Sequence, residues 1–296
     1  RAVTYANSSD NPSTAARTVS FTANDGAVGS NTVTSTVNVT AVNDAPTLTN
    51  LAGDALSYAE GDGAVLIEQG GNATVVDLDS TDFSGGALTV SLISGSDSAE
   101  DVLAVCNQGT GAGQIGVSGS DVTYGGVTIG SFAGGSGGAD LVIAFNASAT
   151  PAAAQALVRN ISYQNTDTDA PTTGARTVRF LLTDGDGGTS ANHDATITVS
   201  AVNDLPVNTV PGSITVTEDV ATALTGISIA DVDAGNASML VTLSAPTGSM
   251  AATSGGGVTV GGTPSALKLA GTITDINAFI AGSNVAYTTA ADANGS

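Results

Sequence analysis

Aspartates separated by one residue recur along this chain, and their spacing suggests metal chemistry. Three such pairs follow strand-like segments: Asp77 with Asp79, Asp167 with Asp169, and Asp231 with Asp233. Two Asn-Asp pairs, Asn43-Asp44 and Asn203-Asp204, precede prolines in similar segments. Ca²⁺ takes six to eight oxygen ligands, mainly carboxylates and carbonyl or amide oxygens. The pattern therefore predicts Ca²⁺ sites, with plain turn formation by Asp and Asn as the alternative.

The charge balance points to the same class of partner. The chain has 27 acidic and 6 basic residues, a formal net charge of −21. Nucleic-acid binding needs Lys and Arg to displace counterions from phosphates, so we expect no nucleic-acid partner. A carboxylate excess of this size repels itself unless cations neutralise it. No apolar run approaches the roughly 18 residues of a membrane span, so no membrane insertion is expected of this segment.

Residues for catalysis are scarce. His193 is the only histidine, Cys106 the only cysteine, and Trp is absent. Glycoside hydrolysis would need two carboxylates flanking the bond in a cleft, and glycan sites usually add aromatic platforms. Because aromatic residues make up only 4% of the chain, we expect no enzyme. A carbohydrate-binding module stays open as a lesser alternative.

An internal repeat sets the domain organisation. Residues 159–206 match residues 1–46, and the segment around Val202 lies 160 positions after its counterpart at Val42 (202 − 42). A third, shorter copy starts after Pro206. Self-similarity at a fixed period is the signature of a repeat protein. We therefore predict part of one repeat over 1–44, a complete repeat over 45–204, and part of a third over 205–296.

Alternating apolar residues predict strands, and turn residues separate them. Strands are expected over 47–60, 64–76, 88–92, 127–132, 140–146, 176–184 and 195–202, with a hairpin at 184–188. Thr150 followed by Pro151 predicts the start of a short helix, and Thr274 its counterpart in the third repeat. The expected fold class is all-β: tandem Ig-like Greek-key β-sandwich repeats with one short inserted helix per repeat.

Counting strand directions from the two linkers assigns the acidic residues to two junctions between repeats. The first junction is expected to gather Asp10, Asn43, Asp44, Asp77 and Asp79. The second is expected to gather Glu60, Asp167, Asp169, Asn203 and Asp204, with Asp231 and Asp233 from the next repeat. A calcium ion held by such a set would draw ligands from both repeats and so restrict the angle between them.

These motifs resemble the cadherin-like repeats of giant bacterial surface adhesins. The resemblance rests on the linkers AVNDAP (41–46) and AVNDLP (201–206), the motifs DLD (77–79) and DVD (231–233), and the lone glutamates Glu60 and Glu218. It implies cadherin-like sandwich repeats in a secreted, cell-surface stalk, stiffened by Ca²⁺ and serving adhesion or biofilm formation. The complete repeat is longer than a cadherin repeat, and it carries an additional helix.

Two other functions stay open at this point. The chain begins with Arg1 and ends within a repeat, so we expect a piece of something longer. Partial repeats could also complete one another between copies, which would make the protein a self-assembling filament or surface-layer component. The expected partners are calcium, neighbouring repeats of the same chain, other copies of itself, and cell-surface glycans.

Overall fold

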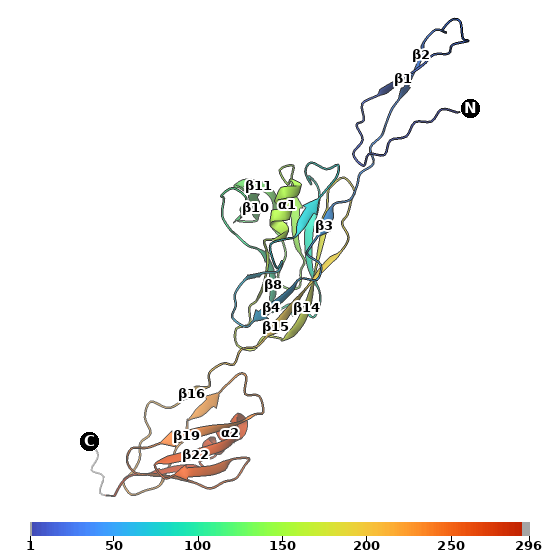
Figure 1. Cartoon of the computed structure of the whole chain (residues 1–296). Coiled ribbons are helices and arrows are strands. Elements are labelled where there is room, and N and C mark those ends of the chain that lie inside the picture. Colours follow the sequence, from blue (N-terminus) through green and yellow to red (C-terminus); the bar gives the residue numbers. More distant parts are fainter. Residues whose placement is uncertain (1, 292–296) are drawn as a thin grey trace. The chain divides into compact units, whose positions relative to one another are not determined.

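The computed structural model describes residues 2–291, and the chain forms two compact units, Arg1–Ala201 and Val202–Ser296 (Figure 1). Each unit is described by itself. The last residues of the predicted third repeat, 292–296, lie outside the described residues. None of the helices within residues 2–291 has the length and apolar character needed to cross a bilayer.

The first unit is built of strands with one short helix. Its strands are β1 (Arg17–Phe21), β2 (Val33–Val37), β3 (Thr47–Thr49), β4 (Ala55–Ala59), β5 (Val65–Leu66), β6 (Thr74–Val76), β7 (Ala87–Ser94), β8 (Asp101–Val105), β9 (Ile115–Ser118), β10 (Asp121–Tyr124), β11 (Val127–Ala133), β12 (Leu141–Phe145), β13 (Ile161–Asn165), β14 (Gly174–Thr183) and β15 (His193–Ser200). The helix α1 (Pro151–Val158) precedes β13. The strands predicted from residue 88 onward all overlap observed strands, two of them fully and three to within two residues at their ends, and the predicted hairpin 184–188 lies in the connection between β14 and β15.

Residues 45–201 of this unit form a β-sandwich. One sheet has the order β4-β15-β14-β7-β12-β11-β10-β9, a second the order β5-β13-β8, and β3 pairs with β6. All these pairings are antiparallel except that of β4 with β15, which is parallel. The small sheet β1-β2 belongs to residues 2–44 and leaves Phe21 and Val33 exposed.

Strict alternation of side chains places the core of the sandwich. In β14, Arg176, Val178, Phe180 and Leu182 are buried, and the residues between them are partly exposed. Because neighbouring residues of a strand face opposite sides, one face of β14 lines the core. Buried residues of β7, β8, β12 and β13, and of α1, belong to the same hydrophobic cluster.

Two predicted strands are each divided in the structure. The strand expected over 47–60 becomes β3 and β4, with positive φ angles at Asn50 (59°) and Gly53 (92°) between them. The bend moves the chain from pairing with β6 to pairing with β15. The strand expected over 64–76 becomes β5 and β6, separated by a loop that folds around the buried carboxylate of Glu68.

The second unit repeats the element order of the sandwich in shorter form. It contains β16 (Val207–Thr209), β17 (Thr222–Ala223), β18 (Ser228–Ala230), β19 (Ser238–Ser244), β20 (Ser249–Ala252), β21 (Thr259–Thr263), β22 (Ala266–Thr272), α2 (Ile273–Ala281) and β23 (Val285–Thr288). The sheets β19-β22-β21 and β17-β23-β20 correspond to β7-β12-β11 and β5-β13-β8. The hairpin β9-β10 has no counterpart among the described residues of the second unit, which explains part of its shorter length.

Each helix begins at a threonine cap. The Thr150 hydroxyl accepts a hydrogen bond from the Ala153 N–H (3.2 Å), as predicted. For α2 the prediction of Thr274 was wrong, because Thr272 caps the helix and Thr274 lies in its first turn. The Thr272 hydroxyl accepts from the Asp275 N–H (3.1 Å) and donates to the Asp275 carboxylate (2.8 Å), a stronger local arrangement than Thr274 could make.

Candidate cation site at the first linker

The first linker meets two loops of the sandwich that follows it. The Asn43 side-chain amide donates to Asp184 Oδ2 (2.9 Å), and the Asp44 N–H faces both carboxylate oxygens of Asp79 at 3.3 Å. Pairing of β3 with β6, in register Thr47 with Val76, delivers the DLD motif to the linker. The structure therefore places the residues 43–44 and 77–79 side by side, as the count of strand directions predicts.

Asp77 organises the loop that approaches the linker. Its Oδ1 accepts hydrogen bonds from the N–H groups of Asp79 (3.2 Å) and Ser80 (2.8 Å). Its Oδ2 is buried and accepts no hydrogen bond within residues 2–291. A buried carboxylate oxygen without a donor is costly, so this atom is suited to a cation ligand.

Asp184, for which the sequence favours a hairpin role over a ligand role, also contacts the linker. Asp184 does form the hairpin turn, because its Oδ1 accepts from the N–H groups of Asp186 (2.8 Å) and Gly188 (2.9 Å). It is also fully buried against the linker. Burial raises the pKa of Asp184, but the hydrogen bonds from Asn43, Asp186 and Gly188 outweigh that effect and hold the pKa below its ordinary value. The count of strand directions, which puts this hairpin at the end of the sandwich near Asn43, was the available signal.

Asp10 lies near the first linker. Together with Asp44 it lines an open cavity of about 280 Å³. The neighbouring Asn11 amide donates to the Leu78 carbonyl inside the DLD motif (3.1 Å). Hydrogen bonds thus connect Asn43, Asp44, Asp77 and Asp79, and Asp10 shares only the cavity with Asp44. Within residues 2–291, however, no three His, Cys, Asp or Glu side chains come together as a metal site requires. The donor types fit a hard cation, and the carboxylates are not gathered about one point.

The second unit builds its linker in the same way. The Asp204 N–H donates to Asp233 Oδ2 (2.5 Å), as that of Asp44 does to Asp79. Asp231 Oδ1 accepts from the N–H groups of Asp233 and Ala234, both at 3.0 Å. In each linker the asparagine amide also donates to the carbonyl of the aspartate after it. The distance is 2.7 Å from Asn203 to Asp204 and 3.1 Å from Asn43 to Asp44.

The remaining predicted ligands lie at the end of the sandwich where β15 ends. The Glu60 N–H donates to the Ser200 carbonyl (2.9 Å), the last residue of β15. Asp167 Oδ1 accepts from the N–H groups of Asp169 and Ala170, both at 3.0 Å, and these bonds lower the Asp167 pKa. The three Asp-x-Asp motifs therefore form one and the same turn.

A buried ion pair within the sandwich was not found from the sequence. Arg176 Nε lies 3.2 Å from Asp101 Oδ2, with both side chains excluded from solvent. The Tyr163 hydroxyl (2.5 Å) and the Asn165 amide (3.1 Å) donate to Asp101 Oδ1. The repeat offered a signal, since Arg17-Thr18-Val19 matches Arg176-Thr177-Val178, which marks this arginine as a recurring feature of the strand.

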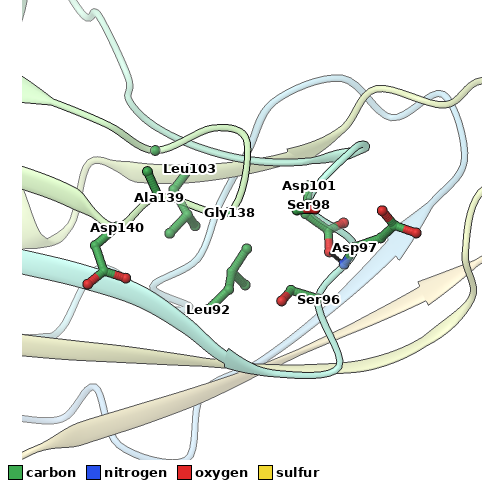
Figure 2. Close-up of a pocket in the computed structure, with 10 residues that line it drawn as sticks. Leu92, Ser96, Asp97, Ser98, Asp101, Leu103, Gly138, Ala139 and Asp140 are labelled. Carbon is green, nitrogen blue, oxygen red and sulfur yellow. Dashed lines mark hydrogen bonds between the residues drawn. The ribbon is translucent and has the colours of Figure 1, made fainter.

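A small pocket lies beside this pair, and Figure 2 shows its lining. Its volume is about 20 Å³, the room of one water molecule. Figure 2 shows Asp97 and Asp101 on one side and Asp140 on the other, with Leu92 and Leu103 between them. The acids therefore do not converge, and Asp101 is already paired. We assign this pocket a structural role.

Comparisons with known proteins give a distant likeness only. No family model matches the chain, and no curated protein matches it. Among solved structures it is similar to the EC1-4 fragment of the protocadherin PcdhgB3, at 15% identity over 87% of this chain and 48% of that one, with a TM-score of 0.29. It is also similar to the endo-fucoidan hydrolase MfFcnA4 of glycoside hydrolase family 107, at 14% identity over 88% and 30%, with a TM-score of 0.23. The chain thus spans less than half of either protein, and neither likeness is close enough to say what it binds or does.

Proposed function

We propose that this chain is a stalk region of a large extracellular repeat protein of the bacterial surface, acting as a spacer in adhesion or biofilm formation rather than as an enzyme. Calcium bound at the linkers would stiffen it. One observation carries the proposal: both linkers hold their aspartate N–H against the second carboxylate of the Asp-x-Asp motif that follows, Asp44 with Asp79 and Asp204 with Asp233.

The electrostatics favour a cation at this place. With a net charge of −21, the chain has few basic side chains to neutralise the linker carboxylates. Within residues 2–291, no ion pair joins Arg or Lys to the aspartates of the first linker, Asp10, Asp44, Asp77 and Asp79. Asp77 Oδ2 supplies a buried oxygen without a donor, and Asp10, Asp44 and Asp79 supply carboxylates nearby. Ca²⁺ would contribute charge neutralisation and a shared ligand set that restricts the linker.

Calcium titration by calorimetry, with thermal melts, tests the proposal on the whole chain. We expect binding, and a melting temperature that rises with calcium concentration, because a ligand at about 100 times its Kd stabilises the bound state by about 2.7 kcal/mol. The variant carrying Asp77→Asn and Asp79→Asn should lose at least one bound ion.

A control variant separates site chemistry from net charge. Asp121→Asn with Asp140→Asn removes the same two charges from exposed positions of the sandwich away from the linker. It should bind calcium as the unaltered chain does. Absence of binding at millimolar calcium would contradict the proposal, and so would equal loss in both variants.

A further inference from the structure

The hairpin β1-β2 repeats the pairing of β14 with β15 without a larger sheet to join. Arg17 lies opposite Val37 in the hairpin, as Arg176 lies opposite Ile197 in the sandwich. The strand β14 also pairs with β7, whereas β1 pairs only with β2 among residues 2–291. Because an isolated two-stranded hairpin is at best marginally stable in water, a further strand beside β1 would stabilise it.

The hairpin also exposes apolar side chains that its counterpart buries. Phe21 is 41% exposed and Val33 is 53% exposed, whereas Phe180, which the repeat matches to Phe21, is fully buried. The free edge of β1 carries backbone groups that another strand can pair with. An unpaired edge next to exposed apolar side chains is the arrangement that binds a partner by strand addition.

In the sandwich, three donors surround one buried carboxylate. The Tyr163 hydroxyl (2.5 Å) and the Asn165 amide (3.1 Å) donate to Oδ1 of Asp101, and Arg176 Nε (3.2 Å) donates to its Oδ2. Asn165 Oδ1 accepts from the Asp167 N–H (2.9 Å), which leaves the amide of Asn165 free to face the carboxylate. The carboxylate thus needs a tyrosine, an asparagine and an arginine at fixed positions of the repeat.

The first segment of the chain contains the same three donors. The repeat matches them, in the order tyrosine, asparagine and arginine, to Tyr5, Asn7 and Arg17. Asn7 Oδ1 accepts from the Ser9 N–H (3.0 Å), which is the same turn that Asn165 makes with the residue two positions after it. The amide of Asn7 is therefore set up locally as that of Asn165 is.

The guanidinium of Arg17 is also held in the same way as its counterpart. It donates to the carbonyls of Ser13 and Ala15, both at 2.6 Å, which lie four and two residues before it. Arg176 donates to the carbonyls at the same two spacings. In both arginines these bonds use terminal nitrogens, so Nε is left for another acceptor.

The acceptor for these three donors is not among the described residues. Within residues 2–291, the Tyr5 hydroxyl, the Asn7 amide and Arg17 Nε donate no hydrogen bond, and Arg17 forms no ion pair. Tyr5 is 46% exposed, whereas Tyr163 is fully buried. The first segment therefore has a complete donor set for one carboxylate that a partner would have to bring.

A second copy of this chain does not supply that carboxylate. In the second unit the matching tyrosine, Tyr287, donates to the Thr247 carbonyl (3.0 Å) instead. Asp101 lies two residues before the strand partner of Tyr163, and the residue two before the strand partner of Tyr287 is Gly248. The aspartate of the first unit is already paired. The partner must therefore resemble the first half of the sandwich rather than the second unit.

We propose that residues 2–44 dock onto an open half-repeat of the β7-β8 type, which adds a strand beside β1 and presents one inward aspartate to Tyr5, Asn7 and Arg17. The docked half-repeat covers Phe21, and the aspartate makes the contact specific, because it is the only acceptor that satisfies all three donors with one group. This assigns the segment an interaction surface beyond the spacer role, and it does not depend on calcium.

A synthetic peptide of residues 86–105, which contains β7 and β8 with Asp101, is the probe for such a partner. Titrated into the whole ¹⁵N-labelled chain, it should shift the signals of the Arg17 Nε–H and the Asn7 side-chain amide, with a Kd on the order of 0.1 mM. The same peptide carrying Asp101→Asn should bind at least about tenfold more weakly, because hydrogen bonds to a charged group are lost.

Variants of the chain provide a second comparison. Arg17→Gln should weaken binding of the unaltered peptide about tenfold. Lys268→Gln, which removes the same charge from an exposed position of the second unit, should leave the binding unchanged. The comparison of the two peptides uses the unaltered chain, so it holds even where Arg17→Gln disturbs the hairpin.

Three results would overturn the proposal. The first is the absence of any shift within residues 2–44 at about 1 mM peptide. The second is equal affinity of the two peptides for the unaltered chain. The third comes from sedimentation of the chain alone, which should show a monomer. A dimer that is lost on Phe21→Ser would mean that a second copy covers the hairpin.

Discussion

The buried Asp101–Arg176 pair gives the sharpest test of how the sandwich is held together. The substitution Asp101→Asn keeps the size of the side chain and removes its charge. Arg176 is fully buried, so it would be left as a charge without a counterion in a low-dielectric interior. Removing one partner of a buried pair is strongly destabilising, by about 3–5 kcal/mol.

Counting the hydrogen bonds of Asp101 gives a similar loss in the free energy of unfolding. Asp101 Oδ2 accepts from the Asp97 N–H (2.7 Å) and Arg176 Nε (3.2 Å), while Oδ1 accepts from Tyr163 and Asn165. An asparagine has one oxygen and one NH₂ group, so either orientation turns the NH₂ group toward two donors. The Tyr163 hydroxyl can also rotate and accept from that NH₂ group, so one or two buried donors are left unsatisfied. At about 1–3 kcal/mol each, the loss is about 1–6 kcal/mol.

Urea denaturation of the whole chain measures this loss in the transition of the first unit. Asp121 is an exposed aspartate in the sheet that contains Arg176, so Asp121→Asn serves as the control and should change the free energy of unfolding by less than about 0.5 kcal/mol. A loss below about 1 kcal/mol for Asp101→Asn would refute the reasoning. The double variant Asp101→Leu with Arg176→Met should be more stable than Asp101→Asn, because it leaves no buried charge.

Two further predictions concern the same sandwich. Burial, and then the hydrogen bond to Asp101, raise the pKa of Tyr163, so its contribution to stability is complete below pH 10.0 and declines as the pH rises above that value. Tyr163→Phe should lower the free energy of unfolding by about 1–2 kcal/mol at neutral pH and reduce its decline at alkaline pH. Urea denaturation on either side of pH 10.0 would measure both effects. An unchanged alkaline decline would contradict the assignment to Tyr163. Gly135 has φ +89°, and a Cβ there would overlap the Leu103 carbonyl, so Gly135→Ala should lower the free energy of unfolding by more than about 1 kcal/mol. Gly137→Ala (φ +63°), with open space around it, is the control, and equal losses would show that the contact with Leu103 is unimportant.

Local patterns in the sequence predicted much of the sandwich because they have local causes. The alternation around Val178 and Phe180 follows from the two faces of a strand, and Thr150 caps its helix through a hydrogen bond three residues away. The division at Asn50 was not predictable in the same way. The chain bends there to pair with β15, which lies about 140 residues further along, and the apolar pattern contains no trace of this change of partner.

In the candidate site, too, some contacts could be predicted from the sequence and others could not. The approach of Asp79 to Asp44 follows from counting strand directions, so the sequence was sufficient to place it. The pairing of Asp101 with Arg176 joins positions 75 residues apart. The sequence did not reveal this pair, because an Asp at the start of a strand and an Arg within a strand are each expected to face solvent. Only the folded core shows that both are buried.

The distribution of the basic residues explains why linker and core should respond differently to cations. Arg176 neutralises the buried carboxylate of Asp101 where water is scarce, and Arg179 pairs with the partly exposed Asp194. Within residues 2–291, no basic side chain forms an ion pair with the aspartates of the first linker, Asp10, Asp44, Asp77 and Asp79. Under the proposed function, a dissolved divalent cation takes that role. Removing the cation would then loosen the linkers. The sandwich would stay folded, because its apolar core and the buried Asp101–Arg176 pair do not depend on that cation.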